Sequence, residues 1–475
     1  MYEFIRLIYK YIDKIMYLKK NQLLPIFKLS QKKSEIEDCP ILFTFTQKIE
    51  LNCDINKLLD LELKELNGKS YWGQLSEKNY FFSLGEIYSI NSDIIKSKSK
   101  LNMNIEKIIK ETISYNETPQ EEIPIFIGGQ NFNLNDKNSN IWDGISSSNY
   151  RIPKILIKKN KNLTTITFFS LIDNKTCLTK LYSKYSVYYR IIKEYKNQRK
   201  QNQIKLESKK IRLSKNIFAN NVTKVKSMID NQNISKAVLS NICEYSFKGD
   251  ITYSSFIESL EKKYPECAVF YYNYNGVFLG ASPEKILSSN QNSLLIDALA
   301  GSINRDKNPQ KDIENQQELL KDKKIIHEHD IVVKGILESL SKININANPG
   351  SKHILKLKNI YHLKTCIKAE KNSENIMDIL DSIAPTPALS GYPKEEAIKI
   401  IENLEDYDRG WYCGAIGWIN SNLNANFYAG LRSAYIKNNY IYIYAGAGIT
   451  KDSIIENEWN EIINKMSAID EIVNE

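Results

Sequence analysis

The chain has 475 residues, with 65 Lys or Arg against 56 Asp or Glu, which gives a formal net charge of +9. A hydrophobic content of 42 % is enough for a large buried core, and the dispersed positive excess argues against a nucleic-acid-binding protein. Because no apolar run is long enough to span a bilayer, we expect no integral membrane association.

The seven cysteines are scattered along the chain, without a CxxC pair or a cluster of zinc-binding spacing. This pattern predicts a reducing compartment, either the cytoplasm or a plastid stroma. Tyrosine is abundant, at 29 residues, whereas glycine and proline are scarce, at 19 and 12. Abundant Asn, Ile, Lys and Tyr have AT-rich codons, so this composition indicates an organelle or a reduced bacterial genome.

The chain begins with a pattern that predicts an amphipathic helix over residues 1–20. The most charged segment, residues 193–216, is expected to be a solvated helix. Further strands and helices are mixed without strict βαβ alternation, and this favours an α+β fold with large antiparallel sheets. The expected strands lie around 41–46, 80–84, 123–127, 164–171, 267–272 and 278–281, and the expected helices around 101–113, 180–210, 221–230, 308–341, 393–404 and 455–472.

The second half contains several residues that could carry chemistry. Lys236 precedes the strand-like run 237–239, and Glu284 follows a Ser-Pro pair beside an apolar strand. Glu328 lies between two histidines that face apart on a helix, so the pair is unsuited to zinc. Arg432 lies in a strand pattern and could hold a carboxylate bidentately.

Residues 444–465 combine a predicted Gly-rich turn with a helix. The turn contains Gly446 and Gly448, and the helix carries Glu458, Glu461 and Lys465 on neighbouring faces. Bare glycines beside two carboxylates and a lysine indicate a site for a small anion and a hard metal ion. A capped, solvated surface helix is the alternative interpretation of the same residues.

The second half of the chain contains nine motifs in succession: SPEKIL, LAGS, HEH, HLKT, PTPALSG, DRGWYCGAIGW, LRSA, AGAGI and EWNE. In this order they resemble the signature of the chorismate-utilising enzymes, which include isochorismate, salicylate, anthranilate and aminodeoxychorismate synthases. The resemblance is dense over 230–475 and fainter at YWGQ (71–74) and FIGGQNF (126–132). It implies one integrated α+β unit with antiparallel sheets flanked by helices, a divergent N-terminal half over 1–215 and a chorismate-binding catalytic half over 216–475.

PTPALSG, DRGWYCG and KAVLS look most like isochorismate synthase, an isomerase. The resemblance then implies conversion of chorismate to isochorismate for menaquinone or phylloquinone biosynthesis, by a monomer or weak homodimer. Ala388 argues against salicylate synthase, which remains open together with an anthranilate or aminodeoxychorismate synthase component. A degenerate protein that only binds chorismate is a further alternative, motivated by Ala384 and Ile325, where the family usually has His and an acidic residue.

The reaction adds water at C2 of the ring and expels the C4 hydroxyl. We expect Glu284 to be the general acid and Lys236 the base, a role that requires a perturbed lysine because an ordinary one is protonated at pH 7. The resemblance implies Mg²⁺ as the cofactor, with Glu328 and Glu461 as direct ligands and Glu458 direct or through water. The residues expected to bind substrate are Gly301, Ser302, His362, Arg432, Gly446, Gly448 and Lys465.

Overall fold

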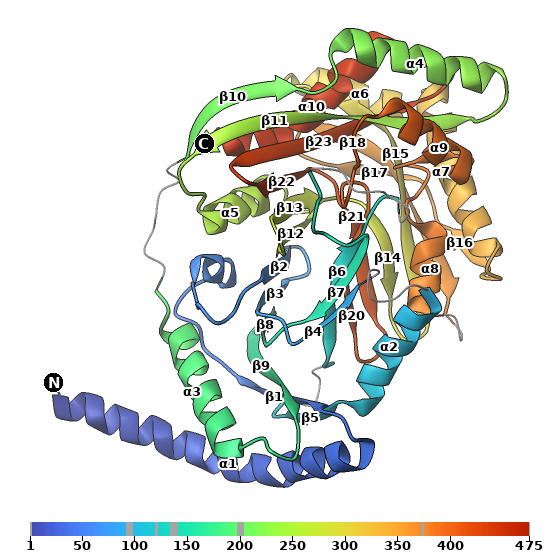
Figure 1. The fold of residues 1–475 in the computed structure, drawn as a ribbon. Helices are drawn as coiled ribbons and strands as arrows, with labels where there is room; N and C mark the ends of the chain where they lie inside the picture. The colour runs from blue at the N-terminus through green and yellow to red at the C-terminus, as the bar shows by residue number, and fades with distance from the viewer. Residues whose placement is uncertain are drawn as a thin grey trace.

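The computed structural model describes residues 2–91, 98–118, 122–133, 141–196, 204–371 and 375–474. Two large sheets form the framework, one of thirteen strands and one of ten, and Figure 1 shows helices arranged around them. Nearly every strand pair is antiparallel, β1 with β5 being the parallel one among those described. The expected single α+β domain is confirmed.

The larger sheet joins strands from distant parts of the chain. β2 pairs with β12, so both halves of the sequence contribute to one continuous sheet, and the division at residue 215 stays a prediction. Its strands, in spatial order, are β10 (Lys205–Ile211), β11 (Lys236–Lys248), β23 (Tyr440–Ile449), β22 (Ser433–Lys437), β13 (Val277–Ser282), β12 (Ala268–Asn273), β2 (Lys69–Gln74), β3 (Asn79–Leu84), β8 (Ile155–Asn160), β9 (Leu163–Ile172), β1 (Ile41–Lys48) and β5 (Ile113–Asn116), with β19 (Gly391–Tyr392) beside β11.

The smaller sheet packs against one face of the larger sheet. Tyr428 and Asn426 of the smaller sheet contact Trp72 and Gln74 of the larger one, and the hydrophobic core that contains Trp72 also includes Phe270, Phe126 and Phe427. Its strands, in spatial order, are β16 (Ala347–Pro349), β18 (Ile360–Glu370), β15 (Ser293–Asn304), β14 (Lys285–Ser289), β21 (Ala425–Ala429), β20 (Ala415–Asn420), β6 (Ile125–Gln130), β7 (Ser148–Ile152) and β4 (Tyr88–Asn91), with β17 (His353–Lys356) beside β18.

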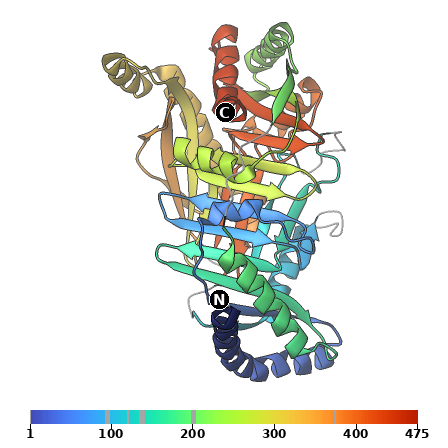
Figure 2. The same ribbon diagram turned by 90° about the vertical axis from the view of Figure 1, so that its left-hand side faces the viewer.

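Helices cover the outer faces of this pair of sheets, as the turned view in Figure 2 shows. A second core joins the larger sheet to helices α1, α3, α4, α5 and α10, whereas α7, α8 and α9 pack into the core that includes residues of both sheets. The helices are α1 (Tyr2–Glu37), α2 (Lys98–Glu111), α3 (Leu178–Glu194), α4 (Lys215–Asp230), α5 (Tyr253–Lys263), α6 (Pro309–Leu319), α7 (Lys323–Ser341), α8 (Ile376–Ile383), α9 (Lys394–Leu404) and α10 (Ile455–Val473), with a 3₁₀ helix η1 at Ile55–Asp60.

The charged segment 193–216 corrects the sequence-based expectation of a solvated helix. α3 ends at Glu194, residues 197–203 lie outside the described part, and β10 is an exposed strand at the edge of the larger sheet. An edge strand with little burial tolerates charged side chains on both of its faces, so its charge pattern imitates a solvated helix. The long helix expected over 308–341 is two helices, because residues 320–322 separate α6 from α7.

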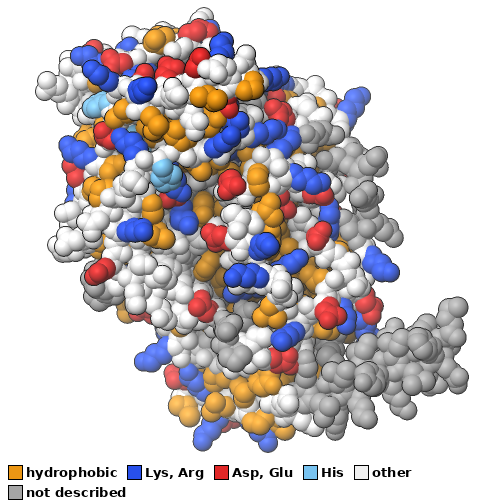
Figure 3. Space-filling view, turned by 180° about the vertical axis from the view of Figure 1, so that it is seen from behind, with side chains coloured by type: hydrophobic (Ala, Val, Ile, Leu, Met, Phe, Trp, Pro, Cys, Tyr) orange, Lys and Arg blue, Asp and Glu red, His pale blue; other side chains and the backbone are white. Residues whose placement is uncertain are grey.

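Surface charge and helix length agree with two expectations about partners. On the face drawn in Figure 3, Lys and Arg side chains are interspersed with Asp and Glu, so the positive excess is not gathered there. Among the described residues, none of the helices combines the length and apolar character that crossing a bilayer requires. The absence of a nucleic-acid partner stays a prediction.

Trp72 packs between the two sheets, so its substitution tests how much this packing stabilises the fold. Its fully buried ring stacks on Phe81 and meets the edge of Tyr428 on β21 at 5.6 Å between ring centroids. We expect Trp72→Ala to lower the free energy of unfolding by about 3–5 kcal/mol, because the cavity it leaves cannot fully collapse. Urea denaturation measures this loss, and Leu75→Ala at an exposed position of the same hairpin should change it by less than about 1 kcal/mol.

Candidate active site

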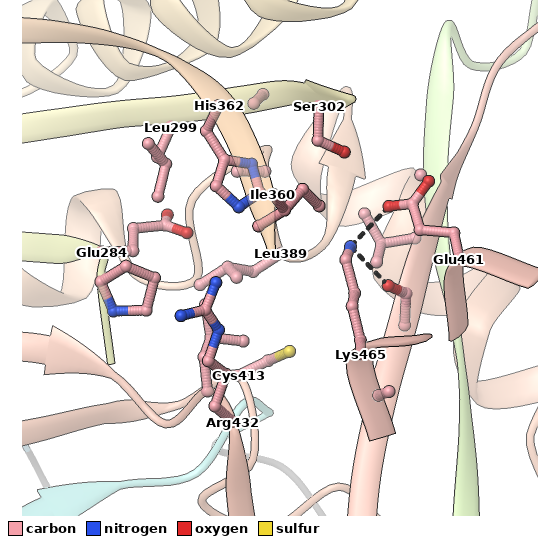
Figure 4. A pocket seen from close by; sticks show the side chains of 18 of the residues that line it. Glu284, Leu299, Ser302, Ile360, His362, Leu389, Cys413, Arg432, Glu461 and Lys465 are labelled. Carbon is pink, nitrogen blue, oxygen red and sulfur yellow. Dashed lines mark hydrogen bonds and ion pairs between the residues drawn. The ribbon is translucent and has the colours of Figure 1, made fainter. Parts of the chain in front are cut away.

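A cavity of about 150 Å³ lies among β11, β15, β18, β23, α7 and α10. Figure 4 shows Glu284, His362 and Arg432 converging toward one part of it, with Glu461 and Lys465 at another. Of the residues predicted from sequence to form the site, only Glu458 does not line this cavity. Those that do are Lys236, Glu284, Gly301, Ser302, Glu328, His362, Arg432, Gly446, Gly448, Glu461 and Lys465.

The predicted Gly-rich turn at 445–448 is wrong, because these residues belong to β23. Gly448 pairs with Val238, and Gly446 pairs with Ser240 on β11. A Cβ atom on Gly448 would lie 2.8 Å from Oε1 of Glu328 and 2.8 Å from Cε of Lys236. Glycine is therefore used here to leave room for side chains of the cavity rather than to reverse the chain.

Lys236 begins β11 and forms a buried ion pair with α7. Its Nζ donates to Oε1 of Glu328 at 2.9 Å, and the two side chains are 1 % and 20 % exposed. Burial acts to raise the pKa of Glu328, but the charge and hydrogen bond of Lys236 outweigh it and the pKa falls below its ordinary value. Glu328 is therefore an ionised carboxylate in the wall of the cavity.

Glu284 is the opposite kind of carboxyl group. It lies between β13 and β14, is 2 % exposed, and accepts a hydrogen bond from the Thr386 hydroxyl at 2.9 Å. Burial raises its pKa to about 8, against the opposing effects of Thr386, Lys236 and Lys465. It is thus mostly a protonated acid at neutral pH, as a proton donor must be.

Two cations face the cavity from different elements. Lys465 on α10 donates to the Gly446 carbonyl at 2.9 Å and pairs with Glu461 at 2.6 Å. Burial would lower the pKa of Lys465, yet the carboxylates around it, Glu461 first, raise it above its ordinary value. Lys465 is therefore held as a cation.

Arg432 is the second cation, and its predicted position within a strand is wrong. It precedes β22 with a φ of 45°, a left-handed conformation that turns the chain there. Its guanidinium lies over the ring of Tyr264, 5.1 Å from the centroid, and no carboxylate among the described residues pairs with it. The group is therefore available to an anionic ligand.

Gly301 and His362 form another part of the wall, where β15 bulges against β18. Gly301 has a φ of 77°, and a Cβ atom there would lie 2.7 Å from Cγ2 of Ile325. Burial, followed by the charges of Arg432 and Lys465, holds the pKa of His362 well below its usual range. His362 is therefore neutral and can donate or accept a hydrogen bond to a polar ligand.

The three carboxylates predicted to hold a metal ion come from α7 and α10. Glu458 is 4 % exposed and pairs with Lys324 at 3.4 Å. Burial raises its pKa, and the charges of Glu461 and Glu328 add to that rise, so the three groups repel one another. In the described part of the chain, no three His, Cys, Asp or Glu side chains are already arranged as a metal site.

The family model described as "Chorismate binding enzyme" matches residues 28–474. The chain belongs to this family.

Individual members of the family align over different shares of the chain. It is 28 % identical to the isochorismate synthase MenF of Bacillus subtilis (strain 168) over 73 % of this chain and 74 % of that protein. It is 36 % identical to the salicylate biosynthesis isochorismate synthase of Pseudomonas aeruginosa over 48 % of each protein. The solved structure of MenF, the menaquinone-specific isochorismate synthase from Escherichia coli, has the same fold, with a TM-score of 0.76 at 20 % identity, covering 91 % of this chain and 96 % of that one.

The departures from the family pattern do not alter the cavity lining. Neither Ala384 nor Ile325 is among the residues around the cavity. The Ala384 carbonyl accepts a hydrogen bond from Lys394, and Ile325 packs against Gly301. His329 is likewise structural, since its Nδ1–H donates to the Ala300 carbonyl and its Nε2 accepts from the Thr365 hydroxyl.

Three residues of the site were missed from the sequence. Thr386 bonds to Glu284, Tyr264 supports Arg432, and Arg409 lies behind the cavity wall. Thr386 lies in PTPALSG and Arg409 lies in DRGWYCG, so both residues were within the family motifs. The spacing of those motifs does not show what the two side chains contact.

Because the pKa of Glu284 is raised in the folded protein, this group should make the free energy of unfolding depend on pH. Between its ordinary value of 4.5 and about 8, the folded protein binds more protons at this group than the unfolded chain does. The free energy of unfolding should therefore fall, relative to that of Glu284→Gln, as pH rises through this window. Urea denaturation of both proteins from pH 4.5 to 8.5 measures the difference, and parallel curves would contradict the assignment.

Proposed function

We propose that the protein is an isochorismate synthase, an isomerase that converts chorismate to isochorismate. The observation that carries the proposal is a protonated carboxyl group, Glu284, in the same cavity as the buried amine of Lys236. Membership of the family and the named isochorismate synthases support it. A family member named anthranilate synthase component 1 aligns at 31 % identity, so product identity has to decide among family activities.

The proposed reaction gives each residue a distinct task. Lys236 removes a proton from water while the oxygen of that water bonds to C2 of the ring, a role for which its amine must first give up the proton that it holds in the ion pair with Glu328. The ring double bonds shift, the C4–O bond breaks, and Glu284 donates its proton to the departing hydroxyl, which leaves as water. One water molecule enters and one leaves, so the product is an isomer of the substrate.

Charge complementarity supports binding of chorismate, which carries two carboxylates. Arg432 lacks an anionic partner among the described residues, and Lys465 remains protonated in another part of the same cavity. We assign these cations to the enolpyruvyl carboxylate. The neutral ring of His362 contacts a ring hydroxyl, while Gly301, Ser302, Gly446 and Gly448 allow close approach of the substrate to the backbone.

We assign Mg²⁺ to Glu328 and Glu461, with Glu458 as a further ligand. Oxygen-only donors suit this ion, and mutual repulsion among the three carboxylates is relieved by a divalent cation. When bound, the ion would neutralise and orient the ring carboxylate of the substrate. In the structure each carboxylate is paired with a lysine, as the ion pairs with Lys236, Lys324 and Lys465 show.

The similar proteins support one of the two predicted quinone pathways and do not support a plastid location. We propose that the product feeds menaquinone biosynthesis, because the similar enzyme from Escherichia coli is a menaquinone-specific isochorismate synthase. The relatives named above are bacterial, so phylloquinone, a plastid location and the monomer or weak homodimer stay predictions.

Turnover tests the function directly. Purified protein with chorismate and Mg²⁺ should yield isochorismate, identified by chromatography, without a need for ammonia. Glu284→Gln and Lys236→Ala should each lower kcat by at least about 10²-fold, because each removes one proton-transfer group. Salicylate together with pyruvate as products would indicate a salicylate synthase. A requirement for ammonia would indicate an anthranilate or aminodeoxychorismate synthase component. Binding of chorismate without any product would indicate a degenerate chorismate-binding protein.

Metal binding can be measured separately from turnover. We expect isothermal titration of the metal-free protein with MgCl₂ to show one site, weakened about 10- to 100-fold in Glu461→Gln and in Glu328→Gln. Glu456→Gln, at an exposed glutamate on the same helix that pairs with Lys215, is the matched control and should leave the affinity unchanged. Equal affinities in all four proteins would exclude these carboxylates as ligands.

A further inference from the structure

Arg409 lies behind the cavity wall and makes four hydrogen bonds while only 2 % exposed. Its Nε and Nη2 donate to the two carboxylate oxygens of Glu405, at 2.9 and 2.6 Å. Its Nη1 donates to the Leu389 carbonyl at 3.1 Å, and Nη2 also donates to the Val238 carbonyl at 2.6 Å. The planar guanidinium thus fixes two backbone carbonyls relative to one carboxylate.

Those two carbonyls belong to different walls of the cavity. Val238 is on β11, two residues after Lys236, and Leu389 lies in the segment that leads to β19. The side chains of Val238 and Leu389 line the cavity, whereas Arg409 does not. Figure 4 shows Leu389 within the group of lining residues that includes Glu284 and Arg432. Arg409 therefore acts on the position of both walls without touching a ligand.

The segment held by Arg409 is organised around Thr386. The Thr386 carbonyl accepts from the Leu389 N–H at 2.9 Å and from the Ser390 N–H and hydroxyl, each at 3.0 Å. The Ser390 carbonyl in turn accepts from the Val238 N–H at 2.9 Å. Since the Thr386 hydroxyl donates to Glu284, a continuous set of hydrogen bonds connects Arg409 with the proposed general acid.

Glu405 extends the same arrangement along β11. Its Oε1 accepts from the Ser240 N–H at 2.7 Å and from the Ser240 hydroxyl at 3.0 Å. β11 is thus held at Val238 and at Ser240 by the two members of one ion pair. Desolvation of the two buried charges offsets much of the attraction between Arg409 and Glu405. The main effect of this ion pair is therefore to fix the positions of the groups that it bonds.

We propose that Arg409 is a positioning residue, which holds the 386–390 segment against β11 so that Thr386 stays within hydrogen-bonding distance of Glu284. The inference rests on the proposed function, because it assigns Glu284 the role of proton donor. The other titratable groups around Glu284 are Asp297 on β15, Lys236 on β11, Lys465 on α10 and Cys413. Arg409 makes no hydrogen bond to any of these groups, although its charge opposes the rise that burial gives to the pKa of Cys413.

Arg409→Lys keeps the charge beside Glu405 but cannot make all four hydrogen bonds. We expect kcat to fall about 10- to 100-fold, as for a small displacement of a catalytic group, with KM for chorismate nearly unchanged. Glu284 must be protonated to act, so activity falls as pH rises through its pKa. Loss of the Thr386 hydrogen bond removes an interaction with the carboxylate, so the alkaline limb of the kcat profile should move up by about one pH unit.

Thr386→Val tests the last step alone and leaves the buried ion pair intact. It should produce the same upward movement of the alkaline limb, and Thr386→Ser, which keeps the hydroxyl, should restore the wild-type profile. The double variant Arg409→Lys/Thr386→Val should shift the alkaline limb of the kcat profile no further than Thr386→Val alone does. Arg212→Lys, at a partly exposed arginine that pairs with Asp406, is the matched control and should change neither kcat nor the alkaline limb of its pH profile.

A second variant covers the case in which Arg409→Lys does not fold. Glu405→Gln with Arg409→Met removes both charges, keeps an acceptor for Ser240, and should give the same movement of the limb. A fall in kcat without movement of the alkaline limb, or additive movements in the combined variant, would overturn the inference. Infrared titration of the Glu284 carboxyl in ligand-free protein, assigned with Glu284→Gln, measures the same shift even where chorismate is not converted.

Discussion

The buried ion pair between Lys236 and Glu328 is the contact on which the architecture of the site depends. A lysine that is 1 % exposed is costly unless an anion pairs with it, so α7 must lie where Glu328 reaches the start of β11. The same helix bonds to the other sheet through His329, which contacts Ala300 and Thr365. α7 is thus fixed to both sheets, and the cavity lies along the contact between them.

This arrangement separates two kinds of carboxyl group within one small volume. Glu284 is neutral because burial dominates its environment, whereas Glu328 is ionised because a lysine lies 2.9 Å away. Proton donation and cation binding require these opposite states, and the fold supplies both by placing one group against Thr386 and the other against Lys236. One ligand in the cavity can therefore contact both a protonated acid, Glu284, and an ionised carboxylate, Glu328.

Sequence reasoning located most elements because β-branched and aromatic runs mark strands that are buried on both faces. It failed at β10, where exposure permits a charged strand, and at Gly446 and Gly448, where glycine serves to leave space rather than to turn the chain. Lys236, Glu284 and Glu328 were identified through the family resemblance, since nothing in their spacing shows that they meet. Arg409 was missed because, besides its ion pair with Glu405, its partners are backbone carbonyls, which no side-chain motif reveals.

The lysine paired with each proposed magnesium ligand has a consequence for binding. At the proposed site, Mg²⁺ would compete with Lys236 and Lys465 for the oxygens of Glu328 and Glu461, so the protein should bind the ion more weakly than the same carboxylates would without lysines. The competition is reciprocal: each lysine that loses its carboxylate would be left in the cavity wall as a cation without an anionic partner. A ligand bearing carboxylates would then compensate the freed lysines, so substrate and metal ion should bind cooperatively.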